Sequence, residues 1–142
     1  MEASPEVIKK RRMMAKKISM RRQLENLKDA TVVVVNPTHY AVALRYEETR
    51  MRAPVVVAKG VDEVAANIRR IANGHDVPIF EAPPLARALF RDVDLGAEVP
   101  ATLYVAVAQV LTYVYQLRMA MRHGASTPTR PFIDPEIETT RH

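Results

Sequence analysis

The chain has 142 residues, a length that fits one domain able to bury a core without disulfides or a metal. It contains no cysteine, which excludes disulfides, thiol catalysis and cysteine-ligated metal. The net charge of +5 is unevenly placed: residues 1–28 carry nine Lys or Arg against three Glu, whereas the remainder has twelve basic and thirteen acidic side chains. The basic character therefore belongs to an N-terminal arm.

The arm itself has the composition of a helix. Residues 5–28 are good helix formers without internal Gly or Pro, and Ser4-Pro5 is a plausible helix start. Their apolar side chains form only a loose stripe among many Lys and Arg. We therefore expect a basic linker helix that buries little against a core.

Three apolar runs follow the arm. The β-branched sequence ATVVVV, residues 30–35, predicts a central strand buried on both faces, and it ends abruptly at Asn36-Pro37. Strand character resumes over residues 40–45. A third short strand is predicted over residues 54–58, between a Pro and Gly60.

Helical periodicity begins after the third strand. Residues 61–73 follow the i, i+3, i+4, i+7 pattern of an amphipathic helix. Residues 78–81 predict a short strand and residues 85–90 a brief helix. A long helix is predicted from Pro100 to about residue 121. Its expected inner side consists of Leu103, Val107, Val110, Val114, Leu117 and Met121.

Strands that alternate with helices predict an α/β domain, a mixed sheet of about four strands surrounded by about four helices and preceded by the basic helix. The uncharged residues 99–117 are interrupted by polar side chains and favour a core helix over a membrane span. We expect three regions: a membrane-proximal linker helix at 1–28, the globular domain at 29–123, and a flexible tail at 124–142 that is rich in proline.

Unusual chemistry is available at Asn36-Pro37, between the first two predicted strands. Asparagine usually reacts with its backbone by attack of the following backbone nitrogen on the side-chain carbonyl. Pro37 blocks this route because it has no N–H. The remaining route is attack of the Asn36 side-chain nitrogen on its own backbone carbonyl, which closes a succinimide and expels the proline nitrogen.

A tight turn between two strands would have to supply the rate of this reaction by holding the groups in position. His39 can accept the proton of the attacking amide or donate one to the leaving nitrogen, and the Thr38 hydroxyl can orient the loop. Asn-Pro is also a common turn dipeptide, and a single His near it is often an ordinary surface residue. Four residues alone leave both interpretations open.

Longer blocks of sequence resemble the FlhB/YscU family. They are NPTHYAVALRY at 36–46, APVVVAKGVDE at 53–63, PPLARALF at 83–90 and LYVAVAQVLTYVYQL at 103–117. The blocks occur in the family's order and spacing. Tyr40, Ala58-Lys59-Gly60 and Pro83-Pro84-Leu85 are more similar to the flagellar branch than to the injectisome branch.

The resemblance implies a domain at the cytoplasmic face of the bacterial inner membrane that cleaves itself within NPTH. Asn36 would be the cyclising residue, Pro37 the released N-terminus, and Thr38 and His39 the supporting loop. This is a single-turnover reaction without a cofactor or a separate substrate. The implied role is to switch export from early rod, hook or needle cargo to late cargo. The implied partners are membrane proteins of the export apparatus, a length-control (ruler) protein and the exported substrates.

Two binding surfaces are expected. Ala53, Pro54, Ala108 and Leu111 are small or apolar residues that could receive a short export signal, although ordinary core packing is the simpler explanation because buried apolar residues usually pack and do not bind. The basic arm can lie against anionic lipid headgroups. The alternative function is a small nucleic-acid-binding module, but the arm lacks aromatic residues for base stacking and any recognised motif. No metal site is expected from His75, His123 and His142.

Overall fold

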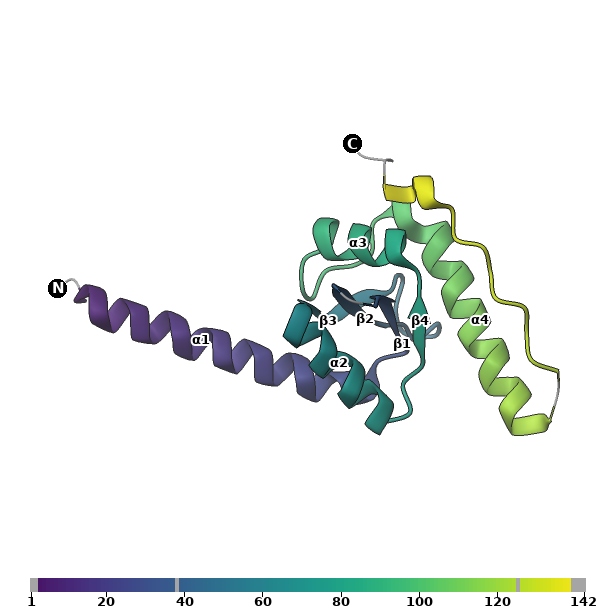
Figure 1. Cartoon of the computed structure of the whole chain (residues 1–142), viewed down its shortest axis with the longest axis horizontal. Helices are drawn as coiled ribbons and strands as arrows, with labels where there is room; N and C mark the ends of the chain where they lie inside the picture. The colour runs from purple at the N-terminus through teal and green to yellow at the C-terminus, as the bar shows by residue number, and fades with distance from the viewer. Residues whose placement is uncertain (1–2, 38, 125, 139–142) are drawn as a thin grey trace.

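The computed structural model describes residues 3–37, 39–124 and 126–138 (Figure 1). In these residues four strands form one sheet of order β3-β2-β1-β4. The strands are β1 (Val32–Asn36), β2 (Tyr40–Arg45), β3 (Val55–Val61) and β4 (Ile79–Glu81). β2 is antiparallel to both β1 and β3, whereas β4 is parallel to β1. The predicted mixed four-stranded sheet is confirmed.

The described residues also form four α-helices and three short 3-10 helices. The α-helices are α1 (Pro5–Asn26), α2 (Asp62–Gly74), α3 (Pro83–Asp92) and α4 (Tyr104–His123). The 3-10 helices are η1 (Leu27–Asp29), η2 (Ala101–Leu103) and η3 (Pro135–Glu138). α2, α3 and α4 lie around the sheet, and α1 precedes it as the basic helix that the sequence predicts (Figure 1).

Each face of the sheet carries its own apolar core. Alternate residues of β1 separate the two: Val32 and Val34 belong to the core shared with α3 and α4, and Val33 and Val35 to the core shared with α2. All four valines are buried. β1 lies between β2 and β4 and is hydrogen-bonded on both sides, so it is the central strand that the β-branched run predicts.

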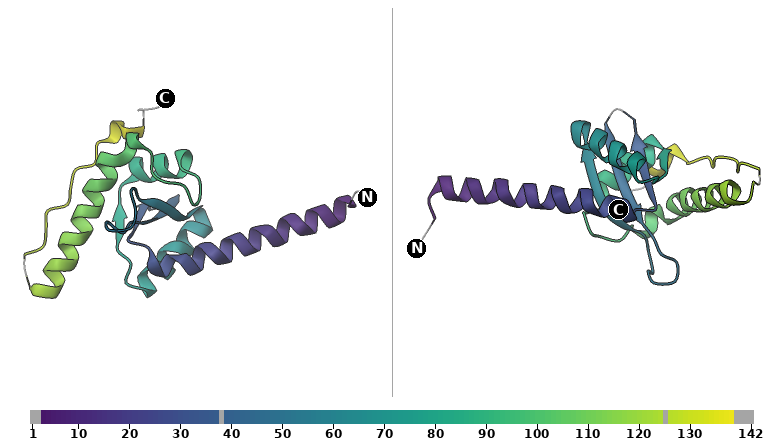
Figure 2. Two further views of the ribbon diagram at one scale, coloured as in Figure 1. Left: turned by 180° about the vertical axis from the view of Figure 1, so that it is seen from behind. Right: turned by 90° about the horizontal axis from the view of Figure 1, so that it is seen from below.

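The basic helix α1 projects away from the rest of the domain, as two further views show (Figure 2). None of its residues is buried, and its apolar side chains do not gather on one face. The helix is joined to the body near its end, where Leu24 packs against the α2-side core and the Gln23 Oε1 atom accepts a hydrogen bond from the Lys59 N–H. Most of the helix therefore remains open to solvent.

The third strand is longer than the sequence predicts. We expected it to end before Gly60, but β3 continues through Gly60 to Val61 and leads directly into α2. A Cβ atom at position 60 would collide with the Val64 side chain on the first turn of α2. The glycine is therefore required by the close approach of α2 to the end of β3, and it does not mark the end of a strand.

The long helix confirms most of its expected inner side but not the end of it. Val107, Val110 and Val114 are buried, whereas Met121 is 78% exposed. The prediction for Met121 is wrong because the last turn of α4 extends beyond the core, and the buried residue there is Ala120. Among the helices of the described residues, none is long and apolar enough to cross a membrane.

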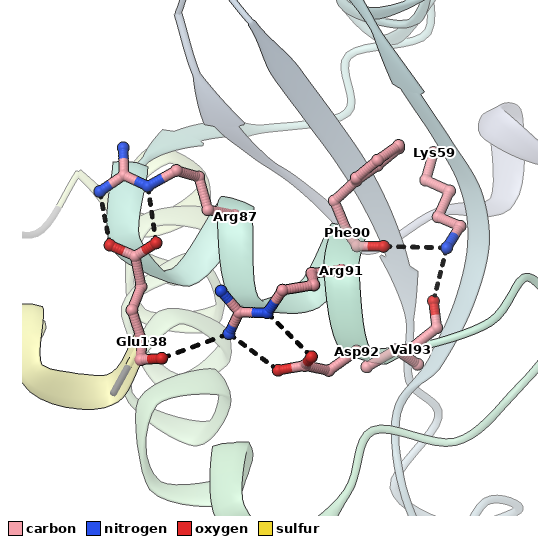
Figure 3. Close-up of polar contacts among 7 residues, drawn as sticks. All are labelled: Lys59, Arg87, Phe90, Arg91, Asp92, Val93 and Glu138. Carbon is pink, nitrogen blue, oxygen red and sulfur yellow. Dashed lines mark hydrogen bonds and ion pairs between the residues drawn. The ribbon is translucent and has the colours of Figure 1, made fainter. Parts of the chain in front are cut away.

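The segment after α4 runs back along that helix in Figures 1 and 2 and ends in η3 beside α3. There the Arg87 guanidinium donates two hydrogen bonds to the Glu138 carboxylate, at 2.7 and 2.6 Å (Figure 3). Earlier in the segment, Arg130 donates to the main-chain oxygen of Glu81 on β4 at 3.2 Å. Ile133 and Ile137 of the segment also pack against the α3- and α4-side core. The described part of the segment thus contacts the domain at several places, and its flexibility stays a prediction.

Candidate functional site

The predicted reactive dipeptide lies in a tight turn between two paired strands. Asn36 is the last residue of β1 and is paired with Tyr40, the first residue of β2. The His39 N–H donates a hydrogen bond of 2.9 Å to the Asn36 carbonyl oxygen, which closes the turn across the Asn36–Pro37 peptide bond. The side chain of Asn36 is half-buried and Pro37 is exposed. Thr38, the fourth predicted site residue, lies outside the described residues.

The far side of the turn is anchored by Tyr40. Its ring packs on Phe90 of α3, with 5.0 Å between the ring centroids. The Lys59 ammonium lies 5.0 Å from the centroid of the Phe90 ring and donates hydrogen bonds to the carbonyl oxygens of Phe90 and Val93, at 3.0 and 2.9 Å (Figure 3). Lys59 therefore holds the end of α3 in place, and α3 supports Tyr40.

The turn also meets the junction of β3 and α2. The Asp62 main-chain N–H donates a hydrogen bond of 3.0 Å to the His39 carbonyl oxygen. The Asp62 Oδ1 atom lies 3.8 Å from His39 Nδ1. Both side chains are solvent-exposed, His39 at 64% and Asp62 at 74%. Water and buffer therefore reach the imidazole freely.

Sequence reasoning assigned no chemical role to Lys59 or Asp62. Both belong to the block that resembles the family, but nothing in their local spacing relates them to Asn36. The register between β2 and β3 makes the connection, because Tyr40 pairs with Val61 and so brings the start of α2 to the turn. The only signal in the sequence is the block at 53–63 that contains both residues.

The structure brings the four predicted partner-binding residues together. Ala53, Pro54, Ala108 and Leu111 line one pocket of about 220 Å³, although they come from the β2–β3 connection and from α4. Ala53 and Leu111 are buried, whereas Ala108 is exposed. The first two form part of the apolar interior, and Ala108 is the member of the set that a ligand can reach most directly.

Among known proteins, the FlhB HrpN YscU SpaS family matches residues 1–114. The flagellar biosynthetic protein FlhB of Yersinia enterocolitica is 49% identical over 130 residues, and that of Salmonella typhimurium is 48% identical over 130 residues. The chain belongs to this family. Each alignment covers 92% of the chain and 34% of the relative, so the chain spans about a third of the length of these FlhB proteins.

Solved structures of the family have the same fold. The crystal structure of the cytoplasmic domain of FlhB from Shewanella putrefaciens matches with a TM-score of 0.77 and 41% identity, over 87% of this chain and 99% of that one. A mutated EscU C-terminal domain matches with a TM-score of 0.63 and 33% identity, over 65% and 92% of the two chains. The chain therefore matches the cytoplasmic part of FlhB, a component of flagellar type III export.

The EscU structures include several single substitutions. One replaces an Asn, another the Pro that directly follows it, and a third the His two residues beyond that Pro. The spacing is that of Asn36, Pro37 and His39 in this chain. No group of metal-ligating side chains occurs in the part of the chain that the structure describes.

Proposed function

We propose that the chain cuts its own backbone between Asn36 and Pro37 by cyclisation of Asn36, and that the cut controls which class of substrate the export apparatus accepts. The observation that carries the proposal is the 2.9 Å hydrogen bond from the His39 N–H to the carbonyl oxygen of the bond that would break. The EscU substitutions at an Asn, a Pro and a His with the same spacing support the choice of residues.

The reaction balances without water. The Asn36 Nδ2 atom attacks the Asn36 carbonyl carbon and loses a proton, and the carbonyl oxygen becomes an oxyanion in the tetrahedral intermediate. When this intermediate collapses, the bond from that carbon to the Pro37 nitrogen breaks and the nitrogen takes up a proton. The products are a succinimide at the end of residues 1–36 and a secondary amine at Pro37. Pro37 suppresses the competing attack by a backbone nitrogen because it has no N–H.

The geometry assists both steps. A hydrogen bond from His39 N–H makes the Asn36 carbonyl carbon more electrophilic and stabilises the oxyanion, and one such donor typically contributes about 10²–10³-fold in rate. β1 and β2 hold the two ends of the turn, which restricts the conformations of Asn36 and so lowers the entropy cost of reaching the attack geometry. The exposed His39 imidazole can exchange protons with the attacking amide and with the leaving nitrogen.

Intact-mass measurement tests the reaction. Freshly purified chain in denaturing solvent should give residues 1–36 and residues 37–142, and the two masses should add up to that of the uncut chain. Hydrolysis by water would instead raise the sum by the mass of one water molecule. Acid quenching at successive times separates the two cases before the succinimide itself hydrolyses. A chain that stays uncut after long incubation at mildly alkaline pH contradicts the proposal.

Substitutions identify the reacting group. Asn36→Ala should abolish the cut and His39→Ala should slow it, because the first removes the nucleophile and the second removes only the imidazole. Asn73→Ala is the matched control, since Asn73 is an exposed asparagine on α2. Cutting of the Asn36→Ala chain at the normal rate would rule out cyclisation.

The cut chain should remain one folded object. β1 ends at the cut, yet it is paired with β2 through five residues and with β4 through three. Each of its four buried valines contributes about 1.5–3 kcal/mol by leaving water. The two fragments should therefore elute together from a sizing column and separate only in denaturant. What changes on cleavage is the local surface at the turn, and we propose that the export apparatus responds to this change.

The division of the chain fits this role. We propose that residues 1–28 lie near the cytoplasmic face of the inner membrane and contact anionic lipid, that residues 29–123 are the processing domain, and that residues 124–142 are a tail outside it. The partners would be membrane proteins of the export apparatus, a ruler protein and exported rod, hook or needle proteins. The family and structure matches described above give no support to the nucleic-acid-binding alternative.

We also propose that the pocket beside Ala108 receives a short apolar export signal. Replacing the exposed Ala108 with Arg should block the pocket and weaken binding of a labelled export-signal peptide in a fluorescence anisotropy titration. Ala66→Arg, at an exposed site on α2, is the control for added charge. Equal peptide affinities of the two variants would mean that Ala53, Pro54 and Leu111 serve only the core.

A further inference from the structure

Asp62 has an uncommon backbone conformation. It is the first residue of α2 and follows β3 without a connecting loop. Its φ angle is +47°, in the left-handed region that most residues with a side chain avoid. Asp and Asn tolerate this region better than other non-glycine residues. The direct passage from strand to helix therefore restricts which residues fit here.

This conformation brings two groups of Asp62 to the same residue. The main-chain N–H donates to the His39 carbonyl oxygen at 3.0 Å, and Oδ1 lies 3.8 Å from His39 Nδ1. His39 is thus held through its backbone and faced by a carboxylate at its ring. The other ring contact is with Tyr40, whose ring meets the imidazole edge-on with 6.4 Å between centroids.

His39 performs two tasks in the proposed cleavage, and Asp62 bears on both. Fixing the His39 carbonyl oxygen fixes the peptide next to the N–H that bonds to the Asn36 carbonyl. The Asp62 carboxylate faces the imidazole at Nδ1, and this arrangement orients the ring and leaves Nε2 to exchange protons. His39 is then the base and Asp62 the carboxylate that orients it.

We propose that Asp62 is a positioning residue for self-cleavage, acting through His39. The inference rests on the proposed cleavage of the Asn36–Pro37 bond. Asp62 takes no part in bond making or breaking. It holds the turn so that the His39 N–H remains hydrogen-bonded to the Asn36 carbonyl oxygen. It also holds the His39 ring in an orientation in which the imidazole can exchange protons with solvent. The chain thereby builds its site from the β1–β2 turn and from the start of α2.

The test replaces Asp62 with Asn in the full chain. Asparagine has nearly the same size and also tolerates positive φ, so only the charge is lost. We expect cleavage to slow by about two- to fivefold, the range for an ion pair exposed to solvent. The difference from the parent should shrink in about 1 M salt, because salt screens exposed charges. A purely structural role would not depend on salt in this way.

Asp76→Asn is the matched control. Asp76 is also an exposed aspartate with positive φ, +57°, and lies just beyond the other end of α2. Its replacement should leave the rate unchanged. In a His39→Ala chain, Asp62→Asn should have little further effect, since the ring on which the carboxylate acts is already gone. Unchanged cleavage in Asp62→Asn, or equal slowing with and without the His39 ring, would overturn the proposal.

A second measurement does not depend on cleavage. In the uncleavable Asn36→Ala chain, NMR should show that Asp62→Asn shifts the ring resonances of His39 and that Asp76→Asn does not. If the parent chain never cleaves but the His39 resonances respond, the cleavage proposal fails while the contact of Asp62 with His39 stands. If cleavage occurs and the resonances do not respond, Asp62 does not position His39.

Discussion

Replacing Gly60 with Ala tests how the site is built. The new Cβ would lie 2.7 Å from Val64 Cβ, and closer still to one of its methyl groups, so either the side chain or the start of α2 must move. The φ angle of Gly60 is not positive, which means that space and not backbone conformation requires glycine here. The experiment is best done in an Asn36→Ala background, where every variant is a single uncut chain.

The magnitude follows from two opposing effects. Overpacking in a tight interior costs about 1–3 kcal/mol. Alanine in place of glycine returns roughly 0.5–1 kcal/mol, because glycine loses more backbone freedom on folding. The net loss should be about 1–2 kcal/mol in the free energy of unfolding. With a urea dependence of about 1.5 kcal/mol per molar, the unfolding midpoint should fall by about 1 M, as measured by far-UV circular dichroism.

A second substitution locates the cause. Val64→Ala removes the methyl group that lies nearest to the new Cβ and should cost about 1 kcal/mol alone, since Val64 is half-buried. The double variant should lose less stability than the two single losses added together, because the contact with this methyl group is gone and only the 2.7 Å contact between the two Cβ atoms remains. If the two losses simply add, or if Gly60→Ala is as stable as its parent, the close approach of α2 to β3 does not explain this glycine.

Three further predictions concern other parts of the chain. Thr31→Val should lower the free energy of unfolding by about 1–3 kcal/mol in urea titrations, because the buried Thr31 hydroxyl accepts the Tyr46 N–H at 3.0 Å and valine leaves that donor unpaired; an unchanged midpoint would contradict this. The hydrogen bond from Arg87 lowers the pKa of Glu138 below its ordinary value of 4.5. The pair's contribution, at most about 1 kcal/mol for so open a contact, is therefore present above that value and lost as pH falls through the lowered pKa. Arg87→Met should accordingly differ in thermal stability from the parent at pH 7 and match it in strong acid, and a difference that persists in acid would refute the assignment. α1 carries many Lys and Arg but no apolar stripe, so its binding to a membrane should depend on charge. The chain should therefore sediment with anionic vesicles at low salt but not at about 0.5 M salt, and retention at high salt would show that the helix inserts.

Much of the fold could be predicted from local patterns. The β-branched run of β1 indicates a strand buried on both faces, and the 3.6-residue period of α2 indicates its helix, because each pattern depends on which sides of an element meet apolar neighbours. Pro37 likewise reveals its chemistry locally, since the missing N–H is a property of one residue. The turn that closes on Asn36 lies between two such predictable strands.

The surroundings of the site were not predictable in this way. Asp62 reaches His39 because β2 and β3 pair in one particular register and β3 leads directly into α2. Gly60 suggested the end of a strand, whereas its actual constraint is a side chain on the following helix. Met121 keeps the helical spacing of the buried residues of α4, but it lies on a turn that extends beyond the core and is exposed. Each of these depends on a three-dimensional neighbour, which the spacing of one segment does not specify.

The central place of β1 has a mechanical consequence for a cut chain. Once the Asn36–Pro37 bond is broken, α1 is joined to the rest of the domain without any covalent link. Tension on α1 is then carried by the strand ladders on both sides of β1. Their hydrogen bonds run across the strand, perpendicular toward the antiparallel β2 and slanted toward the parallel β4, and they share a pull along it. Residues 1–36 would then stay attached through the pairing of β1 with β2 and β4, and they would separate from the domain only when the sheet unfolds.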